Sequence, residues 1–229
     1  MNESLPRTCE RAMLEQFLRA ESMALSAVRS AQTRGVPPGV LQFLRRHEEE
    51  EAKHLRQFEM LLKRPPRTTK VLPRVPSQWW ALAVHVLGYE SLGLEFAKLL
   101  IQVRPHLIAI LEDETVHVAF YEKEVKRLLA EDATTAQRTR EAAQAWRRRL
   151  PQTIDRYLRD DSLAPFRQEI CASMLDTIDA RFAAIGLIVP SATGARTTRS
   201  PQSPNQSWEQ DKQRLVTAWD CGGVGRMDG

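Results

Sequence analysis

The chain has 229 residues, with 33 basic and 29 acidic side chains and a formal charge of +4 at pH 7. This small and dispersed excess does not favour nucleic acid or a membrane surface as a partner. Apolar residues make up 42% of the chain and glycine is scarce, with 10 residues, so the composition indicates an all-α protein with a packed core.

The sequence shows no targeting or membrane segment. The N-terminus lacks the apolar stretch of a secretory signal, and no apolar run reaches the roughly 18 residues of a membrane-spanning helix. The three cysteines lie far apart without a C-x-x-C pair, which is typical of reduced cytosolic thiols. We therefore expect a cytoplasmic protein.

Apolar periodicity predicts two helices at the start of the chain. Apolar residues recurring every three to four positions predict a helix at 9–33, and Gly35 and Pro37 end it. A second helix is expected at 38–63, because Pro38 suits the first helical position, where its missing N–H is not needed. Four prolines then predict a linker: Pro65, Pro66, Pro73 and Pro76.

A second pair of helices is expected after the linker. Ser77 is a suitable N-cap for a helix at 78–100. A turn at 101–104 then leads to Pro105, which opens a helix at 105–130. Short, long and short connections are typical of two antiparallel hairpins joined by a crossover. The sequence up to this point therefore predicts an antiparallel four-helix bundle.

Two additional helices are predicted at 134–159 and 163–187, which would complete a domain at 1–190 and either cover the bundle or shape a substrate pocket. Residues 191–229 are rich in Ser, Thr, Pro, Gly and Gln, which predicts a disordered tail. Five arginines of the first additional helix either touch phosphate or form a solvated face: Arg138, Arg140, Arg147, Arg148 and Arg149.

Two Glu-x-x-His motifs carry the most specific chemical signal. Glu51 and His54 lie in the second predicted helix, and Glu114 and His117 in the fourth. Residues three apart share one face of a helix, so each motif can hold a single metal ion between a carboxylate and an imidazole. One such motif is common on acidic surface helices. Two motifs in matching positions favour a metal site.

Each of the four helices places one acid in its apolar stripe. Glu21 does so in the first helix and Glu90 in the third, beside Glu51 and Glu114 of the motifs. An unpaired buried carboxylate costs several kcal/mol, and two divalent ions would balance four of them. Glu95 is the alternative acid on the third helix, although its helical neighbours are more polar than those of Glu90.

With these residues the chain resembles the ferritin-like di-iron carboxylate superfamily over about residues 9–130. The resemblance implies two iron ions with six ligands: Glu21, Glu51, His54, Glu90, Glu114 and His117. It also implies that Glu51 and Glu114 bridge or share the metals, while Glu21 with His54 and Glu90 with His117 complete each ion. Manganese, or a mixed manganese–iron pair, is compatible with the same ligands.

Three residues near the motifs have two interpretations each. Asp113 either orients a ligand histidine across the bundle or is a surface acid. His47, one turn before Glu51, either supports the metal site or, as we favour, is a histidine at the core edge or surface. Tyr121, one turn after His117, is either a redox tyrosine or, as we favour, a packed aromatic residue.

We expect a non-haem di-iron oxidoreductase that activates dioxygen or peroxide, an oxidase or hydroxylase of an unidentified small substrate with an external electron donor. A homodimer is compatible with this interpretation. The alternatives are a ferroxidase, iron-storage or peroxide-scavenging protein, and a non-catalytic helical interaction module with surface acids. Because ligation needs unprotonated His54 and His117, metal affinity should fall below about pH 6.

Overall fold

The computed structural model describes residues 5–63 and 75–188. This part of the chain is all-α and contains no strand. Its helices are α1 (Glu10–Gln32), α2 (Pro38–Leu62), α3 (Trp79–Val103), α4 (Ile108–Glu131), α5 (Ala133–Tyr157) and α6 (Arg167–Ala184). Three short 3-10 segments accompany them: η1 (Arg7–Cys9), η2 (Pro105–Leu107) and η3 (Asp161–Phe166). The tail predicted at 191–229 and most of the proline-marked linker lie outside the described residues.

The predicted helices are present, and their ends differ where local chemistry decides them. α3 continues through the expected turn to Val103, because the Arg104 N–H still bonds to the Leu100 carbonyl. The last predicted helix, at 163–187, is divided into η3 and α6. Pro165 lies inside η3, and the Asp160 side chain caps its start by accepting from the Ser162 N–H.

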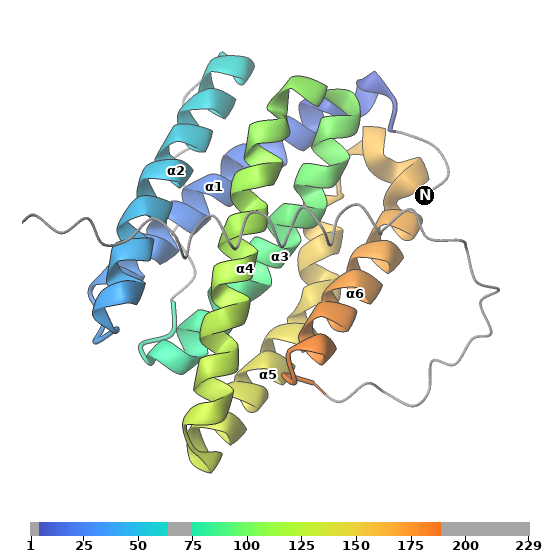
Figure 1. Ribbon diagram of the computed structural model, residues 1–229. Helices are drawn as coiled ribbons and strands as arrows, with labels where there is room; N and C mark the ends of the chain where they lie inside the picture. Colours follow the sequence, from blue (N-terminus) through green and yellow to red (C-terminus); the bar gives the residue numbers. More distant parts are fainter. Residues whose placement is uncertain (1–4, 64–74, 189–229) are drawn as a thin grey trace, which may run out of the picture. The chain divides into compact units, whose positions relative to one another are not determined.

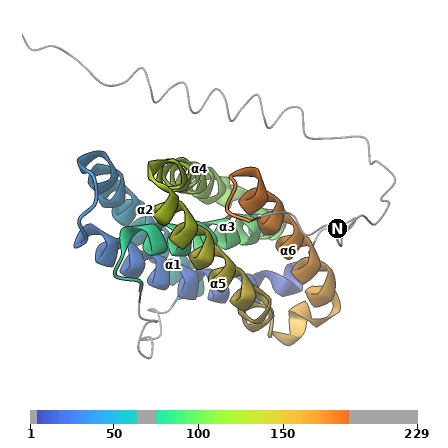
Figure 2. The ribbon, with the colours of Figure 1, turned by 90° about the horizontal axis from the view of Figure 1, so that it is seen from below.

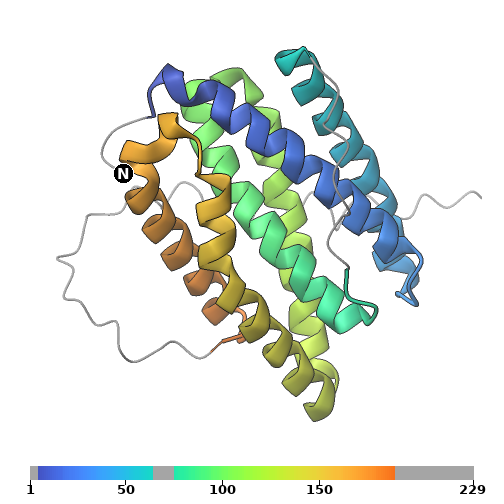
Figure 3. The same cartoon turned by 180° about the vertical axis from the view of Figure 1, so that it is seen from behind.

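The first four helices form two hairpins. Figures 1 and 3 show α2 running back along α1, and α4 running back along α3. The hairpins meet mainly where α1 packs on α3. The inward faces of four helices therefore converge on one interior.

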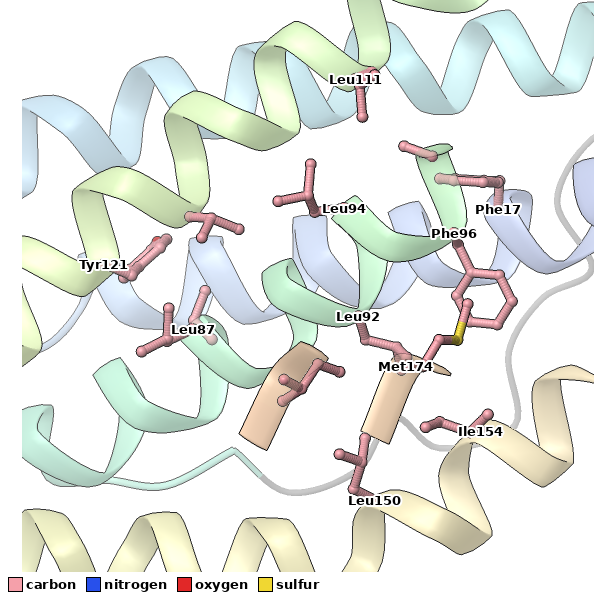
Figure 4. Packing of buried hydrophobic residues seen from close by; sticks show 14 of the residues in the cluster. Phe17, Leu87, Leu92, Leu94, Phe96, Leu111, Tyr121, Leu150, Ile154 and Met174 are labelled. Atoms are coloured by element: carbon pink, nitrogen blue, oxygen red, sulfur yellow. The ribbon is translucent and has the colours of Figure 1, made fainter. Parts of the chain in front are cut away.

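α3 is the central helix of this arrangement. Fifteen of its 25 residues are buried, which exceeds what a single apolar stripe can hold. α5 and α6 cover its remaining face, on the side away from α2 (Figures 1 and 2). In Figure 4, Leu94 points toward Leu111 of α4, whereas Leu92 lies beside Met174 of α6. The two additional helices therefore complete the core around α3.

None of the helices in the described part of the chain combines the length and the hydropathy required of a membrane-spanning segment. Cys9 and Cys171 are free thiols, and the third cysteine lies outside the described residues. The Cys9 thiol donates to the Ser162 carbonyl at 3.2 Å, which ties the start of α1 to η3.

Gly88 allows α5 to approach α3 closely. A Cβ added at this position would lie 2.2 Å from Cε2 of Trp146, a ring held in the core. Gly39, in α2, would instead meet nothing within 4 Å. Substitution of Gly88 therefore tests packing against Trp146, whereas substitution of Gly39 tests helix propensity alone.

We predict that Gly88→Ala lowers the free energy of unfolding by about 1–3 kcal/mol, because the methyl group overpacks the contact with Trp146. Gly39→Ala is the control and should be neutral or stabilising by up to about 1 kcal/mol, since alanine favours the helix and meets no neighbour. Urea unfolding of both variants measures the difference. Equal stabilities would show that α5 does not pack on Gly88.

Candidate metal centre

The four acids and two histidines of the predicted ligand set are all buried between α1, α2, α3 and α4. Their side chains form two overlapping clusters, in each of which one ligand-type atom per residue lies within 4.8 Å of the others. The first cluster consists of Glu21, Glu51, His54 and Glu114. The second cluster consists of His47, Glu51, Glu90 and His117. Glu51 belongs to both, so the two clusters are adjacent.

The helices converge on this point because each motif occupies one helical face. Glu51 and His54 project from α2, and Glu114 and His117 from α4, with each pair one turn apart. α1 and α3 contribute a single acid each, as the apolar stripes predict. The structure therefore brings together residues that lie up to 96 positions apart, from Glu21 to His117.

Each motif histidine is held by an acid from the opposite helix. Nε2 of His54 lies 2.9 Å from Oδ2 of Asp113 on α4, and Nε2 of His117 lies 2.8 Å from Oε2 of Glu50 on α2. Each of these acids directly precedes the motif glutamate of its own helix. A carboxylate on one ring nitrogen fixes the orientation and tautomer of a histidine whose other nitrogen binds metal.

The other ring nitrogens of the two histidines face the clusters without a hydrogen bond. In the described structure Nδ1 of His54 and Nδ1 of His117 are buried and unpartnered, as is Oε2 of Glu51. Nδ1 of His54 lies 3.8 Å from Glu21, and Nδ1 of His117 lies 3.4 Å from an oxygen of Glu90. Buried polar atoms are normally paired, so these three atoms indicate a place for a ligand.

His47 is a third histidine of the site. It is fully buried, with Nε2 3.0 Å from Oε1 of Glu51 and 3.5 Å from Oε1 of Glu90, whereas a core-edge or surface position was favoured from the sequence. Its Nδ1 lies 3.1 Å from the hydroxyl of Tyr121, which is also fully buried. Tyr121 thus packs in the core, as favoured, and also positions the His47 ring.

Glu50 is the residue that the sequence analysis missed. It lies in the acidic run at 48–51, where no single glutamate stands out from its neighbours. The available signal was its equivalence to Asp113, since both directly precede a Glu-x-x-His motif. Asp113 itself takes the orienting position that was one of its two interpretations.

A glycine leaves the space that Glu114 uses. A Cβ on Gly93 would lie 2.8 Å from Oε2 of Glu114, so the carboxylate approaches the α3 backbone directly. Glu95, the alternative acid on α3, lies outside both clusters. It pairs instead with Lys98 at 2.7 Å and lies 4.0 Å from Arg181 of α6.

Burial and mutual repulsion keep protons on the acids of the first cluster. Burial, followed by interaction with Glu21, raises the pKa of Glu51 to about 8. Burial and neighbouring acids also raise the pKa values of Glu21 and Glu114 well above the usual range. These raised pKa values mean that the acids of the first cluster retain protons at pH values where free glutamates are ionised.

The second cluster balances its charge within itself. Burial alone would raise the pKa of Glu90, but attraction to His47 and His117 lowers it to about 2. Burial would correspondingly lower the pKa of His47, but attraction to Glu90 and Glu51 raises it to about 10. In the metal-free protein, protons on His47 and on the acids of the first cluster supply the positive charge that divalent ions would otherwise provide.

Comparisons of the chain with models of protein families, with curated proteins and with solved structures found no match. The interpretation of the site therefore depends on its own geometry.

The metal-free protein should lose stability as the pH rises from about 5 to about 8. In the unfolded chain glutamates ionise near about pH 4.3, whereas the folded state retains protons because the pKa of Glu51 is raised to about 8 and those of Glu21 and Glu114 are also raised. Between these values the unfolded state has released protons that the folded state still binds, so the free energy of unfolding falls with rising pH.

Urea unfolding of the metal-free protein at several pH values measures this dependence. Glu51→Gln is the control variant, because it removes one titrating group and should flatten the slope. A stability that increases between about pH 5 and pH 8 would contradict a protonated carboxylate cluster in the metal-free core.

Proposed function

We propose that the protein is a ferritin-like di-metal carboxylate oxidoreductase that uses dioxygen or peroxide to oxidise a small molecule, with iron as the expected metal. The observation that carries the proposal is the pair of overlapping clusters that share Glu51. Four buried carboxylates and three buried imidazoles from four helices meet there. Such convergence is expensive without a cation.

The chemistry of the donor atoms fits two divalent ions of the iron or manganese type. Carboxylates and imidazoles are the ligands that these hard to borderline ions prefer, and the described clusters contain no thiolate. Two ions of charge +2 would balance the four glutamates once the protons leave. The two hairpins, with Glu-x-x-His on the second helix of each, also follow the arrangement of ferritin-like bundles.

The side chains at this site would have different roles in holding the metal ions. Glu51 would help to hold both ions, because it belongs to both clusters, while Glu50 and Asp113 hold the motif histidines in orientation from the side away from the clusters. Burial of all the ligands limits access of bulk water. When bound, two ferrous ions would supply electrons for the reduction of dioxygen or peroxide.

We predict that Glu51→Ala loses both metals, because this residue alone belongs to both clusters. Glu21→Ala and Glu90→Ala should each weaken one position and leave about one tightly held ion per chain. Glu49→Ala is the matched control, since Glu49 lies in the same acidic run but is exposed, and it should keep two ions. The measurement is elemental analysis after anaerobic reconstitution with ferrous iron, with helix content checked by circular dichroism.

Two outcomes of that experiment would contradict the metal assignment. A Glu51→Ala protein that keeps two ions would show that the shared ligand is wrong. A wild-type protein that binds no metal would favour the non-catalytic helical module instead.

The proposed oxidoreductase activity is tested by measuring how much dioxygen the iron-loaded protein consumes. The iron-loaded protein, given a reductant and a suitable small organic substrate, should consume dioxygen in large excess over the iron present. In a hydroxylation, two electrons come from the substrate and two from the donor. Consumption that stops in proportion to the iron oxidised, with many irons retained per chain, would instead establish iron handling.

A further inference from the structure

A surface cavity of about 470 Å³ lies between α1, α3 and α5, apart from the predicted ligand set. Three arginines line it: Arg19 from α1, and Arg149 and Arg156 from α5. The remaining lining residues are Gln16, Met23, His85, Tyr89, Trp146, Gln152, Thr153 and Tyr157. No carboxylate lies among these residues, so the cavity is basic.

The three arginines keep their charge available. None of them forms an ion pair within residues 5–63 and 75–188, and all three are exposed. Arg147, only two residues before Arg149, is instead bound to Asp179 at 2.6 Å. Arg149, the arginine of this segment that lines the cavity, is therefore available to bind an anion.

A smaller apolar cavity of about 60 Å³ adjoins the basic one. Because a cavity needs about 10–15 Å³ to hold one water molecule, this cavity is large enough to admit part of a small ligand. Most of its lining is apolar, with residues such as Phe17, Ala24, Val86 and Phe96. The four glutamates of the clusters also line this cavity, and none of them lines the basic one: Glu21, Glu51, Glu90 and Glu114.

The two cavities share five lining residues: Gln16, Met23, His85, Tyr89 and Tyr157. Burial, helped by Arg149, lowers the pKa of His85 to about 4, so this side chain is neutral at pH 7. The junction is therefore uncharged. Along one path a ligand meets positive charge at the surface, then a neutral neck, then an apolar chamber that ends at the clusters.

We propose that these adjoining cavities bind a small organic anion, whose acidic group lies at Arg19, Arg149 and Arg156 and whose apolar body extends to the glutamate clusters. Guanidinium groups bind carboxylates and phosphates through paired charge-assisted hydrogen bonds, which suits the basic end. The apolar chamber has no arginine or lysine among its lining residues, so the opposite orientation would leave the acidic group without a cationic partner. Interpreting this anion as the substrate depends on the proposed function, whereas its binding does not.

The test is calorimetric binding to the full-length, metal-free protein. The probes are octane-1-sulfonate, octylammonium and octan-1-ol, which share a chain length and differ in charge. A sulfonate is chosen because it is a weak metal ligand, so residual metal contributes little. We expect octane-1-sulfonate to bind more tightly than octanol, and octylammonium to bind weakest.

The arginines are tested with the triple variant Arg19→Gln/Arg149→Gln/Arg156→Gln. It should bind octane-1-sulfonate at least about tenfold more weakly, and binding of octanol should not change. Arg148→Gln is the matched control, because Arg148 is exposed beside Arg149 but lines neither cavity. These exposed substitutions should leave the helix content unchanged.

The apolar chamber is tested with Ala24→Phe, which places a ring into it. In the wild type octane-1-sulfonate should bind more tightly than butane-1-sulfonate, and in this variant the difference should disappear. A sulfonate affinity that is unchanged in the triple variant, or weaker than that of octylammonium, would overturn the proposal. Failure here would leave two irons per chain and oxygen consumption intact, so the metal assignment is judged separately.

Discussion

The ionic balance of four buried glutamates governs the rest of this structure. Each would cost several kcal/mol as an unpaired anion in the core, yet the helices bring all four together. Without cations the balance is achieved by protons: the pKa values of Glu21, Glu51 and Glu114 are raised, and His47 pairs with Glu90 and Glu51. Metal binding would replace these protons, so it is coupled to their release and weakens as the pH falls.

The two halves of the site are related by pattern and differ in one position. In each half an acid directly precedes Glu-x-x-His and holds the histidine of the other half, as Glu50 and Asp113 do. Four residues before the motif glutamate, however, α2 has His47 and α4 has Ile110. The second cluster thus offers two imidazoles and the first only one. Because nitrogen donors favour later transition metals than oxygen donors do, the two positions are chemically unequal.

The helices and the burial of the six predicted ligand residues could be predicted from the sequence, because acids and Glu-x-x-His motifs interrupt regular apolar stripes. That signal also separated Glu90 from Glu95, whose charge is matched outside the clusters by Lys98. Periodicity could not reveal the roles of His47 and Glu50, because both belong to a polar stretch of α2 in which only Glu51 was marked, by its place in a Glu-x-x-His motif and in the apolar stripe. Their roles depend on contacts with Tyr121 and His117 of α4, which lie 74 residues after His47 and 67 residues after Glu50. The cavities could not be predicted from the sequence either, because they depend on how α5 packs against α1 and α3.

The two sides of the clusters differ because the histidines and the glutamates come from different sets of helices. All three histidines come from α2 and α4. On that side Glu50 is hydrogen-bonded to His117, and Asp113 is hydrogen-bonded to His54. Most lining residues of the apolar cavity belong to α1 and α3. They are joined by glutamates of the clusters but by no cluster histidine. A ligand bound in this cavity would therefore meet carboxylates and not the histidines that Glu50 and Asp113 hold in orientation. The small residues of this face, among them Ala24 and Gly93, leave the space that α5 covers with aromatic and basic side chains. In the proposed binding mode, α5 would therefore form the entrance together with α1 and α3, while the four-helix core would hold the end nearest the clusters.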